Sequence, residues 1–183
     1  LARLEKLVPK EFAQRLMQSR TGRVEGERRI VTILFSDVKG STAIGDERDP
    51  EELMDIMNGA FDLLIEPVYR YEGTLARLMG DAILAFFGAP IAHEDDPERA
   101  CLAALAMQQN IAQYAEQLKR TRGIENFAVR VGINTGLVVV GEVGSDLRVE
   151  YTAMGDAINL ASRMEQAAEP GTIAIAENTA RLA

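Results

Sequence analysis

The sequence predicts a single α+β domain in which helices alternate with the strands of a mostly antiparallel sheet. Its 183 residues are enough for one domain with a full core and a short extension. Short runs of β-branched and apolar residues alternate along the chain with longer segments whose apolar residues recur at helical spacing. Glycine-containing links between neighbouring apolar runs are typical of antiparallel hairpins.

The first strand is predicted at residues 30–35, where apolar residues do not alternate with polar ones, so both faces of the strand should be buried. The strand leads to Asp37 and then to Gly40, Ser41 and Thr42. A carboxylate in that place could hold a metal ion, while backbone amides at the start of a following helix hold phosphate oxygens. A surface aspartate followed by an ordinary hydroxyl cap is the structural alternative.

A helix should begin near Pro50, because a capping residue, a proline and then acidic residues are a helix start signal. Two apolar runs follow at residues 74–79 and 82–87, and the Gly80-Asp81 link between them predicts a hairpin. Two acidic side chains at strand ends are what a pair of divalent cations needs for a phosphoryl displacement. An aspartate in a turn is also a common turn former, which is the alternative for Asp81.

In the second half, the pattern predicts a long helix at residues 96–123 and a last short strand at 172–176. Between them it predicts a strand pair at residues 127–133 and 137–143. The turn of this pair is placed at residues 134–136, because Asn-Thr-Gly is a composition common in turns.

A third polar motif begins with a predicted turn at Gly155-Asp156 and continues as a helix. Asn159 and Arg163 are four residues apart, so they share one face of that helix. A guanidinium beside an amide can stabilise the charge that develops on a transferring phosphoryl group. A solvated helix face is the alternative for such a pair.

The composition argues against some classes of function. A formal net charge of −8 argues against broad nucleic-acid binding. An anionic nucleotide could still bind if divalent cations at the carboxylates, with Arg77 and Arg163 nearby, reverse the local charge. No apolar run reaches about eighteen residues, so we expect no membrane contact from this segment. The single cysteine, Cys101, fits a reducing compartment, and we expect a cytoplasmic location.

The first residues differ in character from the rest of the chain. Residues 1–20 have apolar residues near helical spacing and predict an N-terminal helical extension, interrupted by Pro9. Residues 21–28 are polar with two glycines and predict a linker. Since the first residue is leucine, we expect the segment to come from a longer chain with a regulatory domain upstream.

Three stretches in this order, FSDVKGST, LMGDAILAFFG and YTAMGDAINLASRME, resemble the catalytic domain of the class III nucleotidyl cyclases. The resemblance runs from about Arg29 to the C-terminus, which divides the chain into an extension at residues 1–28 and a catalytic domain at 29–183. It implies a ferredoxin-like, palm-like two-layer sandwich of the α+β class. The family's usual continuation, with a lysine that contacts the phosphates, lies beyond Ala183, so we expect the domain to be truncated at its C-terminal end.

The resemblance also implies roles for individual residues. Asp37 and Asp81 match the family's two metal-binding carboxylates, and the backbone carbonyl of Val38 matches a further metal contact. Two Mg²⁺ or Mn²⁺ ions would bind there. Asn159 and Arg163 match the pair that stabilises the transition state, and in this family they act on the site of the partner subunit in a homodimer.

Two positions match those that read the purine. Thr152, two residues before Met-Gly-Asp, resembles the threonine of a subgroup of adenylyl cyclases that includes the soluble, bicarbonate-responsive enzymes. Arg77 occupies the place of the family's adenine-reading lysine, and although it still donates hydrogen bonds it is larger and planar. Guanylyl cyclases have a glutamate there. The resemblance therefore favours conversion of ATP to 3′,5′-cyclic AMP and pyrophosphate.

Other functions remain open at this point. A guanylyl cyclase uses the same machinery with different purine contacts. A catalytically silent dimeric domain that senses nucleotides is a second alternative. However, all four polar catalytic positions of the family are filled, by Asp37, Asp81, Asn159 and Arg163. A diguanylate cyclase shares the broad architecture, but its Gly-Gly-Asp/Glu-Glu-Phe turn is absent from the sequence.

Overall fold

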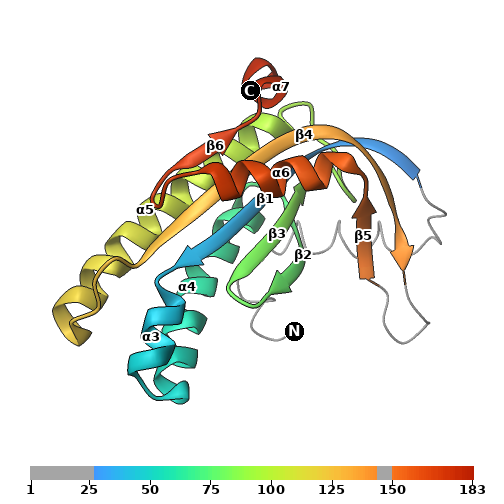
Figure 1. Cartoon of the computed structure of the whole chain (residues 1–183). Helices are drawn as coiled ribbons and strands as arrows, with labels where there is room; N and C mark the ends of the chain where they lie inside the picture. The colour runs from blue at the N-terminus through green and yellow to red at the C-terminus, as the bar shows by residue number, and fades with distance from the viewer. Residues whose placement is uncertain (1–26, 144–149) are drawn as a thin grey trace.

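A computed structural model describes residues 27–143 and 150–183 of the chain, in which helices are interspersed among the strands (Figure 1). In chain order the elements are β1 (Glu27–Lys39), α3 (Ser41–Glu47), α4 (Pro50–Arg70), β2 (Thr74–Met79), β3 (Ala82–Phe87), α5 (Asp96–Arg122), β4 (Ala128–Val143), β5 (Glu150–Met154), α6 (Asp156–Ala167), β6 (Ile173–Ile175) and α7 (Glu177–Leu182). The predicted hairpin at residues 74–79 and 82–87 has the same bounds as β2 and β3.

The described strands form one sheet in the order β2-β3-β1-β4-β5, and β6 pairs with β4. Every pairing is antiparallel except that of β6 with β4, which confirms the predicted mostly antiparallel sheet. β1 lies between β3 and β4, so both of its edges are paired. This central position explains its unbroken apolar run, because Val31 and Ile33 are buried on one face and Leu34 and Val38 on the other.

Helices cover both faces of the sheet (Figure 1). α4 and α5 pack on the face that carries Leu34, Val38 and Phe87. α6 packs on the opposite face, where its Ala161 joins the cluster around Val31. The end of β1 that carries the predicted metal ligands therefore lies between a two-helix layer and α6.

α6 approaches β4 so closely that no side chain fits between them at Gly132. A Cβ atom at this position would lie 2.1 Å from the backbone nitrogen of Glu165 and 2.6 Å from the carbonyl oxygen of Ala161. Backbone atoms cannot turn aside as a side chain can, so the position requires glycine. The contact fixes the height of α6 above the sheet.

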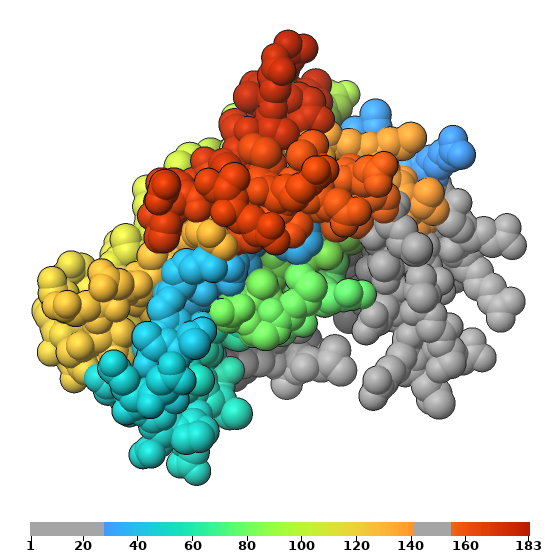
Figure 2. Space-filling view, in the orientation of Figure 1, coloured from blue at the N-terminus to red at the C-terminus, as the bar shows by residue number. Residues whose placement is uncertain are grey.

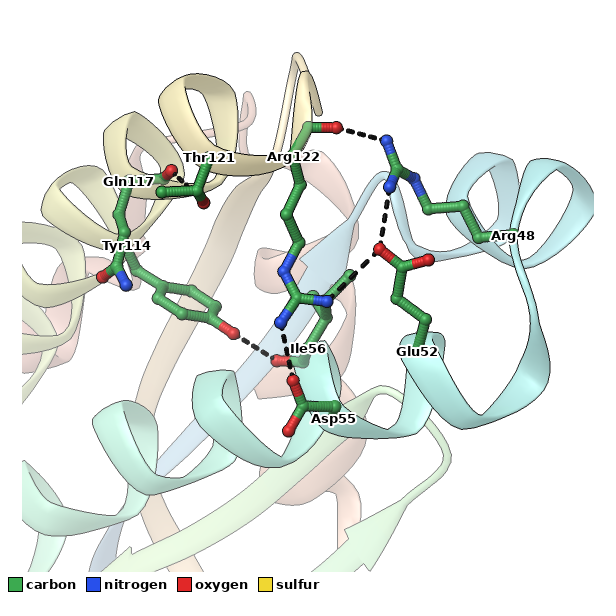
Figure 3. A network of polar contacts seen from close by, with 8 residues as sticks. All are labelled: Arg48, Glu52, Asp55, Ile56, Tyr114, Gln117, Thr121 and Arg122. Atoms are coloured by element: carbon green, nitrogen blue, oxygen red, sulfur yellow. Dashed lines mark hydrogen bonds and ion pairs between the residues drawn. The ribbon is translucent and has the colours of Figure 1, made fainter.

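Charged side chains tie α3, which directly follows β1, to the two long helices (Figure 3). The Arg48 guanidinium donates to Glu52 of α4 at 2.8 Å and to the carbonyl oxygen of Arg122, the last residue of α5. Arg122 in turn donates to Glu52 at 3.2 Å and to Asp55 at 2.7 Å. We call these four residues the α3 clamp.

The predicted turn at residues 134–136 is wrong, because β4 runs unbroken through both predicted strands. The Asn134 side-chain amide donates to the carbonyl oxygen of Ala157 in α6 at 2.9 Å. The Thr135 hydroxyl lies 2.9 Å from the Thr32 hydroxyl of β1. Residue types that are common in turns here make buried tertiary contacts, which a local sequence pattern does not reveal.

β5 is a strand that the sequence pattern does not predict. It pairs with the last part of β4, from Val139 opposite Met154 to Val143 opposite Glu150. Residues 137–143 therefore pair antiparallel with β1, at residues 137–140, and with β5, at residues 139–143, and not with the segment at 127–133.

The N-terminal predictions fall largely outside the described residues. The predicted helical extension at residues 1–20 and most of the linker at 21–28 lie there, while Glu27 and Arg28 already belong to β1. Among the residues that the structure describes, we find no helix with the length and apolar character needed to cross a membrane.

Candidate active site

The backbone brings the two predicted metal-binding positions to the same place. Asp37 lies near the end of β1 and is paired with Ala82 at the start of β3. Asp81 directly precedes Ala82 in the turn between β2 and β3, and its carbonyl oxygen accepts a hydrogen bond from the Val38 amide at 3.0 Å. The tip of the hairpin is therefore pinned against the end of β1, as the predicted pair of acidic side chains requires.

The three predicted phosphate-binding residues lie beside Asp81 at the start of α3. The Ser41 hydroxyl donates to the Asp81 carboxylate at 2.9 Å. Gly40 has a left-handed backbone with φ of 96°, and a Cβ atom there would lie 3.1 Å from the carbonyl oxygen of Asn126, so glycine is favoured on both counts. Thr42 is exposed. In this arrangement Ser41 orients Asp81.

Asp37 is surrounded by charged groups that sequence reasoning missed. Its carboxylate contacts the Lys39 ammonium at 2.9 Å and the Arg130 guanidinium at 3.3 Å. Arg130 also donates through its Nε to the Glu165 carboxylate at 3.1 Å. Arg130 stands opposite Asp37 in the β1–β4 ladder, a register that no local sequence signal gives. Glu165 is the last residue of the motif YTAMGDAINLASRME. It lies two residues after Arg163 and therefore on a different side of the helix.

Glu165 is a buried carboxyl on the inner side of α6, with 6% of its surface exposed. Burial raises the pKa of Glu165 above its usual range, and the neighbouring Asp37 carboxylate raises this pKa further. The positive charge of Arg130 acts in the opposite direction. A salt-bridged chain of Asp37, Arg130 and Glu165 thus runs from the end of β1 to α6.

Asn159 and Arg163 lie on α6 four residues apart, and both side chains are exposed. The residues of α6 that pack on the sheet are others, with Ala161 and Glu165 buried. The helix therefore presents its predicted catalytic pair outward, while its inner side faces the sheet near Asp37. Figure 2 shows the end of β1, in blue, at the surface between α6, in orange, and the green β2–β3 hairpin.

The two predicted purine-reading positions lie on the two edge strands of the main sheet order. Arg77 is exposed on β2 and is paired with Leu84, which in turn pairs with Phe35 of β1. Directly paired residues share a face of a sheet, as do residues two apart on one strand, so Arg77 lies on the face that carries Asp37. Thr152 belongs to β5 and is paired with Gly141. β2 and β5 also contact each other, although they are at opposite ends of the strand order.

The donor chemistry of the site fits a hard divalent cation. Two carboxylates and one carbonyl oxygen, from Asp37, Asp81 and Val38, are oxygen ligands of the kind that Mg²⁺ and Mn²⁺ prefer. Within residues 27–143 and 150–183, no group of three or more His, Cys, Asp or Glu side chains is arranged to hold a metal ion. The residues present would therefore supply part of a coordination shell, as is usual where substrate phosphates and water complete it.

A family model described as "Adenylate and Guanylate cyclase catalytic domain" matches residues 24–183. The chain belongs to this family. Adenylate cyclase 1 of Rhizobium meliloti (strain 1021) is 38% identical to this cyclase domain over 161 residues, which are 86% of the chain and 24% of that relative. The chain thus spans about a quarter of the length of that curated relative.

Solved structures of both purine specificities are similar to this cyclase domain. The adenylyl cyclase CyaB from P. aeruginosa has a TM-score of 0.83 at 34% identity, covering 87% of the chain and 82% of that structure. The guanylyl cyclase Cya2 has a TM-score of 0.81 at 35% identity, covering 87% of the chain and 80% of that structure. The fold class predicted from sequence is therefore that of cyclase catalytic domains, and overall similarity does not separate the two purines.

Proposed function

We propose that this domain is an adenylyl cyclase that converts ATP into 3′,5′-cyclic AMP and pyrophosphate. The observation that carries the proposal is the pairing of β1 with β3, which sets Asp81 beside the end of β1 that holds Asp37, in a chain of the cyclase family. In this reaction the ribose 3′-hydroxyl of the nucleotide attacks its own α-phosphorus and pyrophosphate leaves.

In the proposed site, Asp37, Asp81 and the carbonyl of Val38 hold two divalent ions. When bound, such ions would lower the pKa of the 3′-hydroxyl and neutralise negative charge on the triphosphate. Ser41 restricts the orientation of the Asp81 carboxylate through their 2.9 Å hydrogen bond. Gly40 and Thr42, at the same helix start, are proposed to contact the phosphates of the bound nucleotide.

Asn159 and Arg163 are proposed to act on the site of a partner subunit in a head-to-tail homodimer. Their outward position on α6 supports this, because an exposed pair on the outer side of the helix is available to another chain. There Arg163 would stabilise the charge that builds up at the α-phosphate, and Asn159 would orient the ribose. Such a dimer has two sites, each of which needs both chains.

Selection of adenine is proposed to rest on Arg77 and Thr152. The contact between β2 and β5 supports a joint role, because it brings the two strands that carry these residues together within one chain. Arg77 offers hydrogen-bond donors, whereas the glutamate expected of a guanylyl cyclase at this place would accept hydrogen bonds. We further propose that the domain works in the cytoplasm, under the control of a regulatory domain upstream in a longer chain.

The test is a parallel incubation of the chain with ATP or GTP and Mn²⁺, followed by detection of cyclic nucleotide and pyrophosphate. We expect cyclic AMP as the main product, and no product from Asp37→Ala. Glu116→Ala, which removes an exposed carboxylate of α5, serves as the matched control and should keep wild-type turnover.

A guanylyl cyclase is the second candidate, because a solved guanylyl cyclase is as similar to the chain as a solved adenylyl cyclase. Faster turnover of GTP than of ATP would establish this candidate and overturn the assignment of adenine. Nucleotide binding without any cyclic product would instead identify a silent sensing domain.

A further inference from the structure

Arg130 is shared between a predicted metal ligand and a buried glutamate. Its Nη2 lies 3.3 Å from the Asp37 carboxylate, its Nε donates to Glu165 at 3.1 Å, and its Nη1 donates to the Gln166 carbonyl oxygen at 3.1 Å. Two of these three acceptors belong to α6. The guanidinium is therefore held mainly from the α6 side, with Asp37 as its third partner.

Glu165 cannot leave this arrangement by a small movement. Its side chain is 7% exposed, and its backbone nitrogen is packed directly over Gly132 of β4. Removing a carboxylate from water is unfavourable unless a cation and hydrogen bonds compensate. Arg130 is the cation that compensates Glu165, so the two carboxylates compete for one guanidinium.

The four ion-paired side chains at Asp37 balance in charge before any metal ion binds, and the Asp81 carboxylate nearby adds a further negative charge. Asp37 and Glu165 are negative, and Arg130 and Lys39 are positive, so the group is neutral. Without the charge of Glu165 these four side chains would have a net positive charge, and Asp37 would be the only carboxylate among the described residues in contact with Arg130. Both effects oppose the approach of a divalent cation to Asp37.

We propose that Glu165 is a positioning residue that sets the cation affinity of the site, by holding Arg130 so that the Asp37 carboxylate stays available to Mg²⁺ or Mn²⁺. The inference rests on the proposed function in one respect, the role of Asp37 as a metal ligand. It gives Glu165 a part in the chain's own site, on a different side of α6 from the exposed pair that is proposed to act on the partner's site.

The test is a titration of the whole chain with Mn²⁺ alone, in which the electron paramagnetic resonance signal of free Mn²⁺ reports binding. Measurements are made at pH 8, because burial raises the pKa of Glu165 and an alkaline pH favours its ionised form. The site is defined as the Mn²⁺ binding that is lost in Asp37→Asn. Glu165→Gln should raise the Mn²⁺ dissociation constant of this site roughly three- to tenfold, and Arg130→Gln should lower it by a similar factor.

The double variant Glu165→Gln/Arg130→Gln restores the charge balance and should return the dissociation constant to near the wild-type value. Glu169→Gln, an exposed carboxylate four residues from Glu165, is the matched control and should leave the constant unchanged. A general loss of structure would weaken binding in all the variants, so the opposite shifts separate the proposed role from unfolding. If Glu165→Gln does not fold, Arg130→Gln and the double variant still give the sign.

An unchanged dissociation constant in Glu165→Gln, or shifts of the same sign in both single variants, would overturn the inference. The same holds if wild type binds no more Mn²⁺ than Asp37→Asn. Opposite shifts in a chain that makes no cyclic nucleotide would uphold the inference while the proposed function fails. Cyclase activity together with an Mn²⁺ affinity that is unchanged in Glu165→Gln would uphold the proposed function and overturn the inference.

Discussion

At the residue scale, single contacts decide how the site is assembled. The Ser41 hydroxyl donates to Asp81, and the glycine at position 132 lets α6 lie directly on β4. Neither role can be read from the local pattern, because a serine at a helix start normally caps the helix and a glycine inside a strand normally only weakens it.

Replacement of Ser41 by alanine should weaken the use of metal ions without unfolding the domain. The substitution removes one hydrogen bond to a charged group, which is worth about 1.5–3 kcal/mol. We expect the Mn²⁺ concentration for half-maximal cyclase activity to rise roughly tenfold, with a smaller change at saturating Mn²⁺. Thr121→Ala removes an exposed hydroxyl of α5 and should leave the Mn²⁺ dependence unchanged. An identical Mn²⁺ dependence in Ser41→Ala and wild type would contradict a role in orienting Asp81.

Replacement of Gly132 by alanine should destabilise the fold, because the added Cβ meets backbone atoms of α6 that have nowhere to move. We expect a loss of about 3 kcal/mol in the free energy of unfolding, measured by urea denaturation. Gly45→Ala is the matched control, since the added Cβ there meets only the end of the Leu53 side chain and alanine favours a helix. Equal stabilities of the two variants would show that α6 can lift away from the sheet.

At the element scale, the α3 clamp joins three helices through half-exposed charges (Figure 3). Hydrogen bonding to Arg48 is the largest cause that lowers the pKa of Glu52, and Arg122 lowers this pKa further. A carboxyl whose pKa is lower in the folded chain adds stability that is present above its unfolded pKa and is lost as the pH falls through its folded pKa. The α3 clamp should therefore stabilise the fold at neutral pH and lose this contribution in acid.

Glu52→Gln tests this pH dependence through thermal unfolding. We expect the variant to melt below wild type at pH 7, and the difference to disappear as the pH is lowered below about 4.5 and through the folded pKa. Glu116→Gln, an exposed carboxylate of α5 outside the clamp, should melt with wild type at every pH. A difference that persists in acid would mean that Glu52 acts through packing and not through its charge.

The sequence pattern succeeds for elements whose signals are local. The β2–β3 hairpin is predicted to the residue, because two apolar runs and a Gly-Asp link specify it without help from the rest of the chain. The prediction of two strands in place of β4 is wrong, because the side chains of Asn134 and Thr135 form hydrogen bonds with α6 and β1. The candidates Asp37 and Asp81 come from local motifs in the same way, whereas the contacts of Arg130 and Glu165 depend on the β1–β4 register and on which side of α6 is buried.

At the scale of the whole molecule, the proposed site residues lie on two faces of the chain that need not serve the same site. Asp37 and Asp81 lie at the end of β1, and Asn159 and Arg163 point outward from α6. In the proposed head-to-tail dimer, the carboxylates of one chain meet the outward pair of the other.

Mixing two inactive variants tests this arrangement. Asp37→Ala and Arg163→Ala should each be nearly inactive alone, because every site in either homodimer lacks one group. A heterodimer of the two contains one site with both defects and one intact site, so an equal mixture should recover roughly a quarter of wild-type activity. The measurement is cyclic AMP formation after co-refolding, and Asp37→Ala co-refolded with Asp81→Ala should recover nothing. Absence of recovery in the first mixture would place all four residues in one chain's site.

β1 is a single unbroken strand from Glu27 to Lys39, hydrogen-bonded to β3 on one side and β4 on the other. Asp37 lies ten residue steps along the strand from Glu27, a span of roughly 33 Å. Sliding by one residue would turn every side chain to the wrong face, so the two ladders forbid that motion. A displacement of Glu27 should therefore reach the Asp37 end of β1 as a tilt or twist of the whole strand. No loop lies between the two residues to absorb the motion.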